Sequence, residues 1–205
     1  MPLKEKIPNQ MLYIVLLTAH DILGENAVKS VLNFAHLQKY INNYPPNDLN
    51  EEHDLLDFTR LMVGLIDLLG ERGARAIMFR GGVRGFEIFH EQFPSLMNIE
   101  GITPEEKTDD KMFEEFMRIY GIMVDASVIL WGDIFKYYPC EEGAALEISP
   151  CQYCVGLKTN EPICNAQVGF QFGVLRWILG KEVKVEETHC IAKGDPMCRF
   201  VMHRP

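Results

Sequence analysis

The stretch that decides the fold runs from Glu187 to Phe200 and reads ETHCIAKGDPMCRF. Strand-forming residues flank a Lys-Gly-Asp-Pro sequence at 193–196, which is strong turn chemistry. The stretch therefore predicts a β-hairpin, with Glu187 and Cys190 near the end of one strand and Cys198 near the start of the other. Glu187 and Cys190 are three residues apart and would face opposite sides of a regular strand. The strand must therefore end or bulge by Cys190 if both side chains are to reach one point.

A helix-like run precedes the hairpin and begins soon after Cys164. Folding this helix back over the hairpin would bring Cys164 to the same spot as Glu187, Cys190 and Cys198, which we call the quartet. Three thiolates and a carboxylate make a four-coordinate Zn²⁺ shell, and a shell filled by protein ligands is typical of a structural site. The alternative is buried free thiols beside a surface glutamate. His189 is the second-ranked ligand in place of Glu187.

The pattern E-x-x-C-x-A-x-G-D-x-x-C-x-F resembles the C-terminal signature of the 4-vinyl reductase domain family, and the resemblance covers residues 149–202. That family includes hydrocarbon-binding proteins, the sensor domains of phenol- and xylene-responsive regulators, and a protein associated with bacteriochlorophyll 4-vinyl reductase. It shares a broad fold group with the TRAPP-type vesicle-tethering subunits. In the phenol sensors, zinc is held by a cysteine before a helix, a glutamate and two cysteines. The resemblance places these roles on Cys164, Glu187, Cys190 and Cys198.

Length and charge limit the function classes. The chain has 205 residues, of which 47% are hydrophobic, enough for a sizeable core. We expect a single domain over 1–205, with a helical part at 1–110 and a 4-vinyl-reductase-like core at 111–205. The net charge of -9 argues against binding to nucleic acid or to anionic membranes. No secretory signal and no run of about 20 apolar residues is found, so a cytoplasmic protein without a membrane span is expected.

The N-terminal half is predicted to be helical. Apolar residues recur at helical spacing over 10–42 and again from 55 to 69. The sequence DILGE at 21–25 recurs as DLLGE at 67–71, which favours two similar helix–glycine–helix corners over a duplicated hairpin. The sequence RGGVRG at 80–85 is interpreted as a site of close helix packing, with a phosphate-binding loop as the less favoured alternative.

A long helix is predicted from Phe113 to Tyr138, with aromatic residues crowded at its end. Such a helix can line a pocket for a flat apolar ligand, whereas ordinary core packing is the commoner use of these residues. The pocket candidates are Phe116, Tyr120, Met123, Trp131 and Phe135. The segment before this helix, 93–111, is acidic and loop-like.

Three further cysteines lie outside the quartet: Cys140, Cys151 and Cys154. The last two form a C-x-x-C pair. With Cys140 this pair is a candidate second metal site, part of an iron–sulfur cluster, or a redox dithiol. Reduced structural thiols are the favoured interpretation.

These elements predict an α/β (α+β) fold. Several N-terminal helices pack on an antiparallel sheet from the C-terminal third, with strands at 144–149, 182–189 and 197–203, as the resemblance to 4-vinyl reductase and TRAPP-type domains also implies. No catalytic constellation is found, so an enzyme is less favoured. The favoured function is a domain that binds or senses a hydrophobic or aromatic small molecule and carries structural zinc. Alternatives are a tetrapyrrole vinyl-reductase-associated protein, an iron–sulfur or redox protein, and a TRAPP-type dimeric interaction protein. A homodimer is expected.

Overall fold

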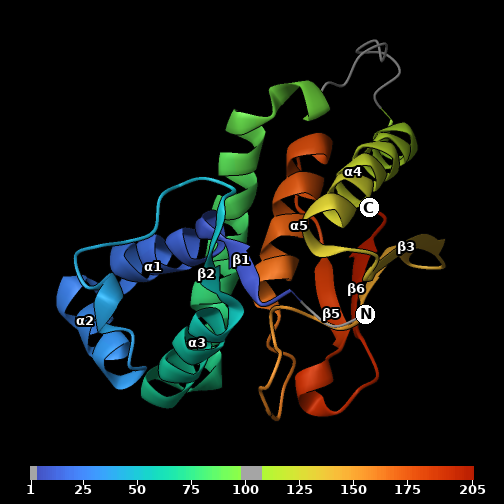
Figure 1. The fold of residues 1–205 in the computed structure, drawn as a ribbon. Helices are drawn as coiled ribbons and strands as arrows, with labels where there is room; N and C mark the ends of the chain where they lie inside the picture. The colour runs from blue at the N-terminus through green and yellow to red at the C-terminus, as the bar shows by residue number, and fades with distance from the viewer. Residues whose placement is uncertain (1–3, 98–107) are drawn as a thin grey trace.

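The computed structural model describes residues 4–97 and 108–205 (Figure 1). Helices dominate the first two thirds of the chain, and strands dominate the last third. The expected loop at 93–111 therefore lies largely outside the described residues. In chain order the elements are β1 (Lys6–Pro8), α1 (Asn9–Leu23), α2 (Glu25–Phe34), β2 (Glu51–Asp54), α3 (Leu55–Gln92), α4 (Asp109–Trp131), β3 (Phe135–Cys140), β4 (Gly143–Ile148), α5 (Asn165–Leu179), β5 (Val185–His189) and β6 (Cys198–His203), with short 3-10 turns at Gln38–Tyr40, Pro94–Met97 and Ile191–Lys193.

The main sheet has four strands in the order β3-β4-β6-β5, and every neighbouring pair is antiparallel. Helix α5 packs against β5 and β6, and it packs against α3 more extensively than any other pair of elements does. In Figure 1, α5 accordingly stands between α3 and the sheet, and α4 crosses near its upper end. The expected fold class, helices packed on an antiparallel C-terminal sheet, is confirmed.

Two glycines set how closely α3 and α5 approach. A Cβ atom added to Gly82 would lie 2.0 Å from the carbonyl oxygen of Ala166, and one added to Gly169 would lie 2.0 Å from that of Phe79. Any side chain at either position would therefore collide with backbone, which cannot move aside as a flexible side chain can. The close-packing interpretation of the sequence at 80–85 is confirmed.

The two copies of the DILGE-like sequence form matching corners. Gly24 separates α1 from α2 with φ 82° and ψ 166°, and Gly70 interrupts α3 with φ 73° and ψ 165°. Only glycine adopts this backbone conformation readily, because other residues have a Cβ atom that clashes there. The helix expected to end at residue 69 therefore resumes after the corner and continues to Gln92.

The long helix expected from Phe113 to Tyr138 is wrong at its C-terminal end. Helix α4 stops at Trp131, because Gly132 takes a positive φ of 79° and turns the chain. The aromatic residues that follow form β3, which pairs with β4 along its whole length. Their alternation between exposed and partly buried positions is the period of a strand, and it was obscured by the helical pattern before it.

Among the described residues, no helix combines the length and the apolar character that crossing a membrane requires. The same residues include a second, two-stranded sheet that the sequence did not predict. It is formed by β1 and β2, which bring residues 6–8 against residues 51–54.

The glycine crossing gives a test on adjacent residues. Gly82→Ala should lower the free energy of unfolding by about 2 kcal/mol or more, because the methyl group forces α3 and α5 apart. Gly81→Ala is the control, since its Cβ would meet nothing closer than 3.8 Å. That variant should stay within about 1 kcal/mol of the parent or gain stability, because alanine favours the helix. Chemical denaturation measures both, and equal effects would contradict the packing argument.

Candidate metal centre and ligand cavity

Five buried cysteines from separate segments meet beside the N-terminus of α5. We call them the thiol cluster: Cys151, Cys154, Cys164, Cys190 and Cys198. The Sγ atom of Cys164 lies 3.7 Å from those of Cys151 and Cys198 and 3.9 Å from that of Cys190. The Sγ atom of Cys154 lies 3.5 Å from that of Cys198. A tetrahedral ion with metal–sulfur bonds of about 2.3 Å holds its sulfurs about 3.8 Å apart, so these spacings fit a shared metal ion.

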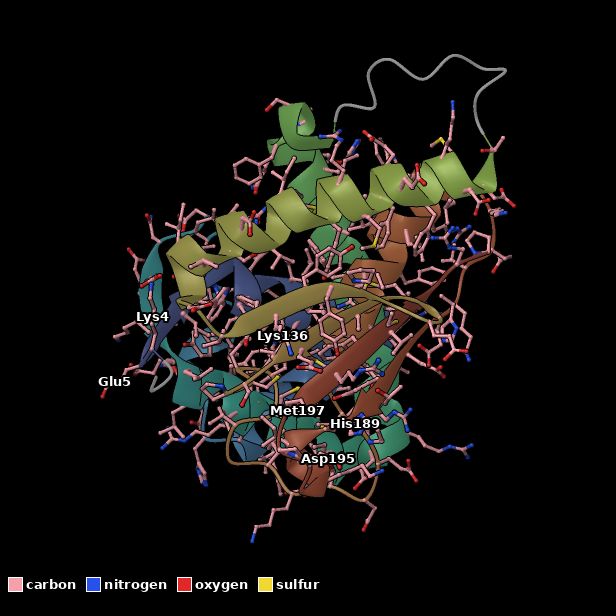
Figure 2. The ribbon with its side chains drawn as sticks, turned by 90° about the vertical axis from the view of Figure 1, so that its right-hand side faces the viewer. Lys4, Glu5, Lys136, His189, Asp195 and Met197 are labelled. Carbon is pink, nitrogen blue, oxygen red and sulfur yellow. The ribbon has the colours of Figure 1, made fainter. Side chains whose placement is uncertain are left out.

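The hairpin delivers its ligands through an irregularity in β5. The register between β5 and β6 shifts between Glu187 and His189, and β5 ends before Cys190. This is the bulge or strand end that the three-residue spacing requires. The carboxylate of Asp195, in the turn, accepts a hydrogen bond from the Cys190 backbone N–H at 2.8 Å. Figure 2 shows His189, Asp195 and Met197 gathered at this end of the sheet, and the His189 side chain is exposed and away from the thiols.

Glu187 lies against the thiol cluster with one oxygen satisfied and one free. Its Oε2 accepts a hydrogen bond from the Cys164 backbone N–H at 2.8 Å, whereas its buried Oε1 has no partner. Burial, followed by the neighbouring Cys190 thiol, raises the pKa of Glu187 to about 9. Burial also raises the pKa of Cys151 and of Cys164. An unpartnered buried carboxylate oxygen beside thiols is the arrangement that a bound cation would satisfy.

The donors form two overlapping sets of four, and within each set all ligand atoms lie within 4.8 Å of one another. One set is the quartet. The other contains Cys151, Cys154, Cys164 and Cys198, so the C-x-x-C pair joins the same centre. Cys140 lies apart from both sets, at the end of β3 opposite Gly143.

A cavity of about 440 Å³ lies among α1, α3, α4 and α5. Four of the five pocket candidates line it: Tyr120, Met123, Trp131 and Phe135. The fifth, Phe116, is buried in the core and stacks on the Tyr120 ring with centroids 5.4 Å apart. Among the described lining residues none is charged, and none is a histidine or cysteine.

The cavity has a polar end that sequence reasoning missed. The Gln167 side-chain amide donates a hydrogen bond to the Tyr120 hydroxyl at 3.0 Å. Burial raises the pKa of Tyr120, so its hydroxyl stays protonated and able to donate. The Oε1 atom of Gln152 is buried without a partner, and Tyr153 lines the cavity beside it. Single glutamines carry no spacing signature, and the only signal was the position of Gln152 and Tyr153 inside the C-x-x-C pair.

Known structures with this fold include H-NOX proteins. An H-NOX structure labelled Tt has a TM-score of 0.58 and 15% identity, covering 97% of this chain and 96% of that one. An H-NOX protein from S. oneidensis has a TM-score of 0.53 and 12% identity, covering 94% and 98%. Likeness at this identity shows the fold alone. Haem does not fit the cavity, because its described lining offers neither a histidine or cysteine ligand nor a basic side chain for the propionates.

The C-terminal part has curated relatives. The uncharacterized protein MJ0745 of Methanocaldococcus jannaschii is 40% identical over 55 residues, which are 27% of this chain and 30% of that protein. The phenol regulator MopR of Acinetobacter guillouiae is 33% identical over 43 residues, which are 21% of this chain and 8% of that protein. The chain therefore spans less than a third of either relative. The 4-vinyl reductase domain family matches residues 144–204, which contain the whole thiol cluster and Glu187. By this match and the shared cysteine pattern, residues 144–204 are a 4-vinyl reductase domain.

Proposed function

We propose that this chain binds a small, uncharged, mainly apolar organic molecule and serves as a ligand-sensing module of the 4-vinyl reductase domain type. The observation that carries the proposal is the cavity of about 440 Å³, within the size range of small-molecule sites. Its walls are aliphatic, aromatic and methionine side chains, and no charged residue is among the described lining. A charged ligand would lose its hydration there without gaining a counter-ion, so an uncharged one is favoured.

The polar end defines the ligand further. Tyr120 offers a hydroxyl donor, and Gln152 offers an amide oxygen without a partner. A ligand hydroxyl can accept from the first and donate to the second, which an apolar molecule of the same size cannot do. The similarity of residues in the C-terminal family domain to a phenol regulator supports a ligand of this class.

A structural zinc ion at the quartet belongs to the same proposal. The free Oε1 of Glu187 and the thiol spacings support it, and the four protein donors would leave no coordination position for a substrate. When bound, zinc would supply a cross-link between α5 and the β5–β6 hairpin. Cys164 would hold the helix, and Cys190 and Cys198 would hold the two strands.

The ligand proposal is tested with phenol and toluene as probes on the full chain. Isothermal titration should show saturable binding, with phenol bound more tightly than toluene, because only phenol engages the polar end. Met123→Trp should abolish binding of both probes, since Met123 lines the cavity and the larger ring fills it. The control is Ile122→Trp, one residue away, where the parent side chain is 40% exposed and outside the cavity. That variant should bind normally.

Equal loss of binding in both tryptophan variants, with both folded by circular dichroism, would contradict the cavity as the binding site. Equal affinity for phenol and toluene would contradict the role given to the polar end.

The zinc proposal predicts a difference between two cysteine variants. Cys190→Ser should lose zinc and lower the free energy of unfolding by about 2 kcal/mol or more, because the metal stabilises only the folded state. Cys140→Ser should keep both zinc and stability, since Cys140 lies outside the donor sets. Elemental analysis and chemical denaturation measure the two effects. Full zinc content in folded Cys190→Ser protein would refute the quartet.

A further inference from the structure

Zinc at the quartet leaves two buried thiols unused, those of Cys151 and Cys154. Each touches a different quartet member. The Sγ atom of Cys151 lies 3.7 Å from that of Cys164, and the Sγ atom of Cys154 lies 3.5 Å from that of Cys198. The pair therefore contacts the two quartet sulfurs that are themselves 3.7 Å apart.

The backbone between the two cysteines presents them as a chelating pair. The Cys154 N–H approaches the Cys151 carbonyl at 3.4 Å, so the chain turns and both sulfurs reach the thiol cluster. The two residues between them, Gln152 and Tyr153, line the cavity instead. C-x-x-C is a common spacing for two ligands of one zinc ion, because a tight turn aims both thiolates at one point.

Two tetrahedra that share an edge account for every donor. One tetrahedron is the quartet, and the other is Cys151, Cys154, Cys164 and Cys198. The shared edge joins Cys164 to Cys198. A thiolate sulfur has more than one lone pair, so each of these two sulfurs can bridge two ions. A single ion would use four donors and leave two others buried beside it without a partner, which is costly in a site closed to water.

Resting on the proposed zinc quartet, we propose that the thiol cluster is a dinuclear centre. A second thiophilic divalent cation, Zn²⁺ or Cd²⁺, is held by Cys151 and Cys154 and shares Cys164 and Cys198 with the first ion. Glu187 and Cys190 complete the shell of the first ion only. The assignment gives the C-x-x-C pair a role that neither a redox dithiol nor a set of structural thiols would require.

Charge supports two ions over one. With all six donors ionised, a single divalent ion would leave a formal charge of about -4 in a buried site, and two ions would leave about -2. Few basic groups are close enough to compensate. Lys193 follows the cluster in sequence but its side chain is exposed, and Arg199 beside Cys198 is directed to the Tyr138 and Thr188 hydroxyls. The second ion therefore removes a charge that the described surroundings do not neutralise.

The test counts ions in the full chain, purified under reducing conditions and loaded with ¹¹³Cd²⁺. Native mass spectrometry should find two ions in the parent protein and one in the Cys151→Ala/Cys154→Ala variant. Cys140→Ala is the matched control and should keep two. Cadmium NMR of the parent protein should show two resonances of equal intensity, a readout that does not depend on any variant folding.

The failures are distinguishable. One ion in both the parent and the double variant would overturn the dinuclear centre and leave the proposed zinc quartet standing. One ion that is lost in the double variant and kept in Cys190→Ala would overturn both, in favour of a single tetrathiolate ion. A parent protein with one ion and a mass two hydrogens lower, from a Cys151–Cys154 disulfide, would likewise overturn the second ion. No bound ion at all would refute both proposals.

Discussion

The C-terminal half of this protein depends on holding five thiols and one carboxylate in one buried volume. The donors come from a turn after β4, the start of α5 and both strands of the β5–β6 hairpin, so their meeting fixes how these segments dock. Without a cation this arrangement is unfavourable, because Glu187 keeps an unpartnered buried oxygen and a pKa raised to about 9. A bound cation turns the same groups into a cross-link.

The thiol cluster and the cavity are neighbours through one short segment. Cys151 and Cys154 contact the other thiols, whereas Gln152 and Tyr153 between them line the cavity. On the other side, Gln167 at the polar end lies one helical turn after Cys164. The metal centre therefore positions the polar groups that a ligand would meet. The close approach of α3 and α5 at Gly82 and Gly169 holds the remaining walls in place.

The parts of this site that are local in sequence were predictable. Glu187, Cys190 and Cys198 stand in one hairpin, whose turn residues and required irregularity in β5 follow from spacing. Cys151 and Cys154 joining the same centre was not predictable, because their distance from Cys198 in space depends on how β4 pairs with β6. The pairing of β1 with β2 and the end of α4 were missed for similar reasons: short strands carry little periodicity, and Gly132 was outweighed by the apolar pattern around it.

The most direct test of the central claim is zinc K-edge X-ray absorption on the protein as purified, without added metal. A thiolate-bound structural centre predicts a first shell dominated by sulfur at about 2.3 Å, with at most a minor oxygen contribution from Glu187. A first shell of oxygen and nitrogen alone, or a folded protein that holds no metal and has its thiols paired in disulfides, would contradict the claim that a metal–thiolate centre organises this fold.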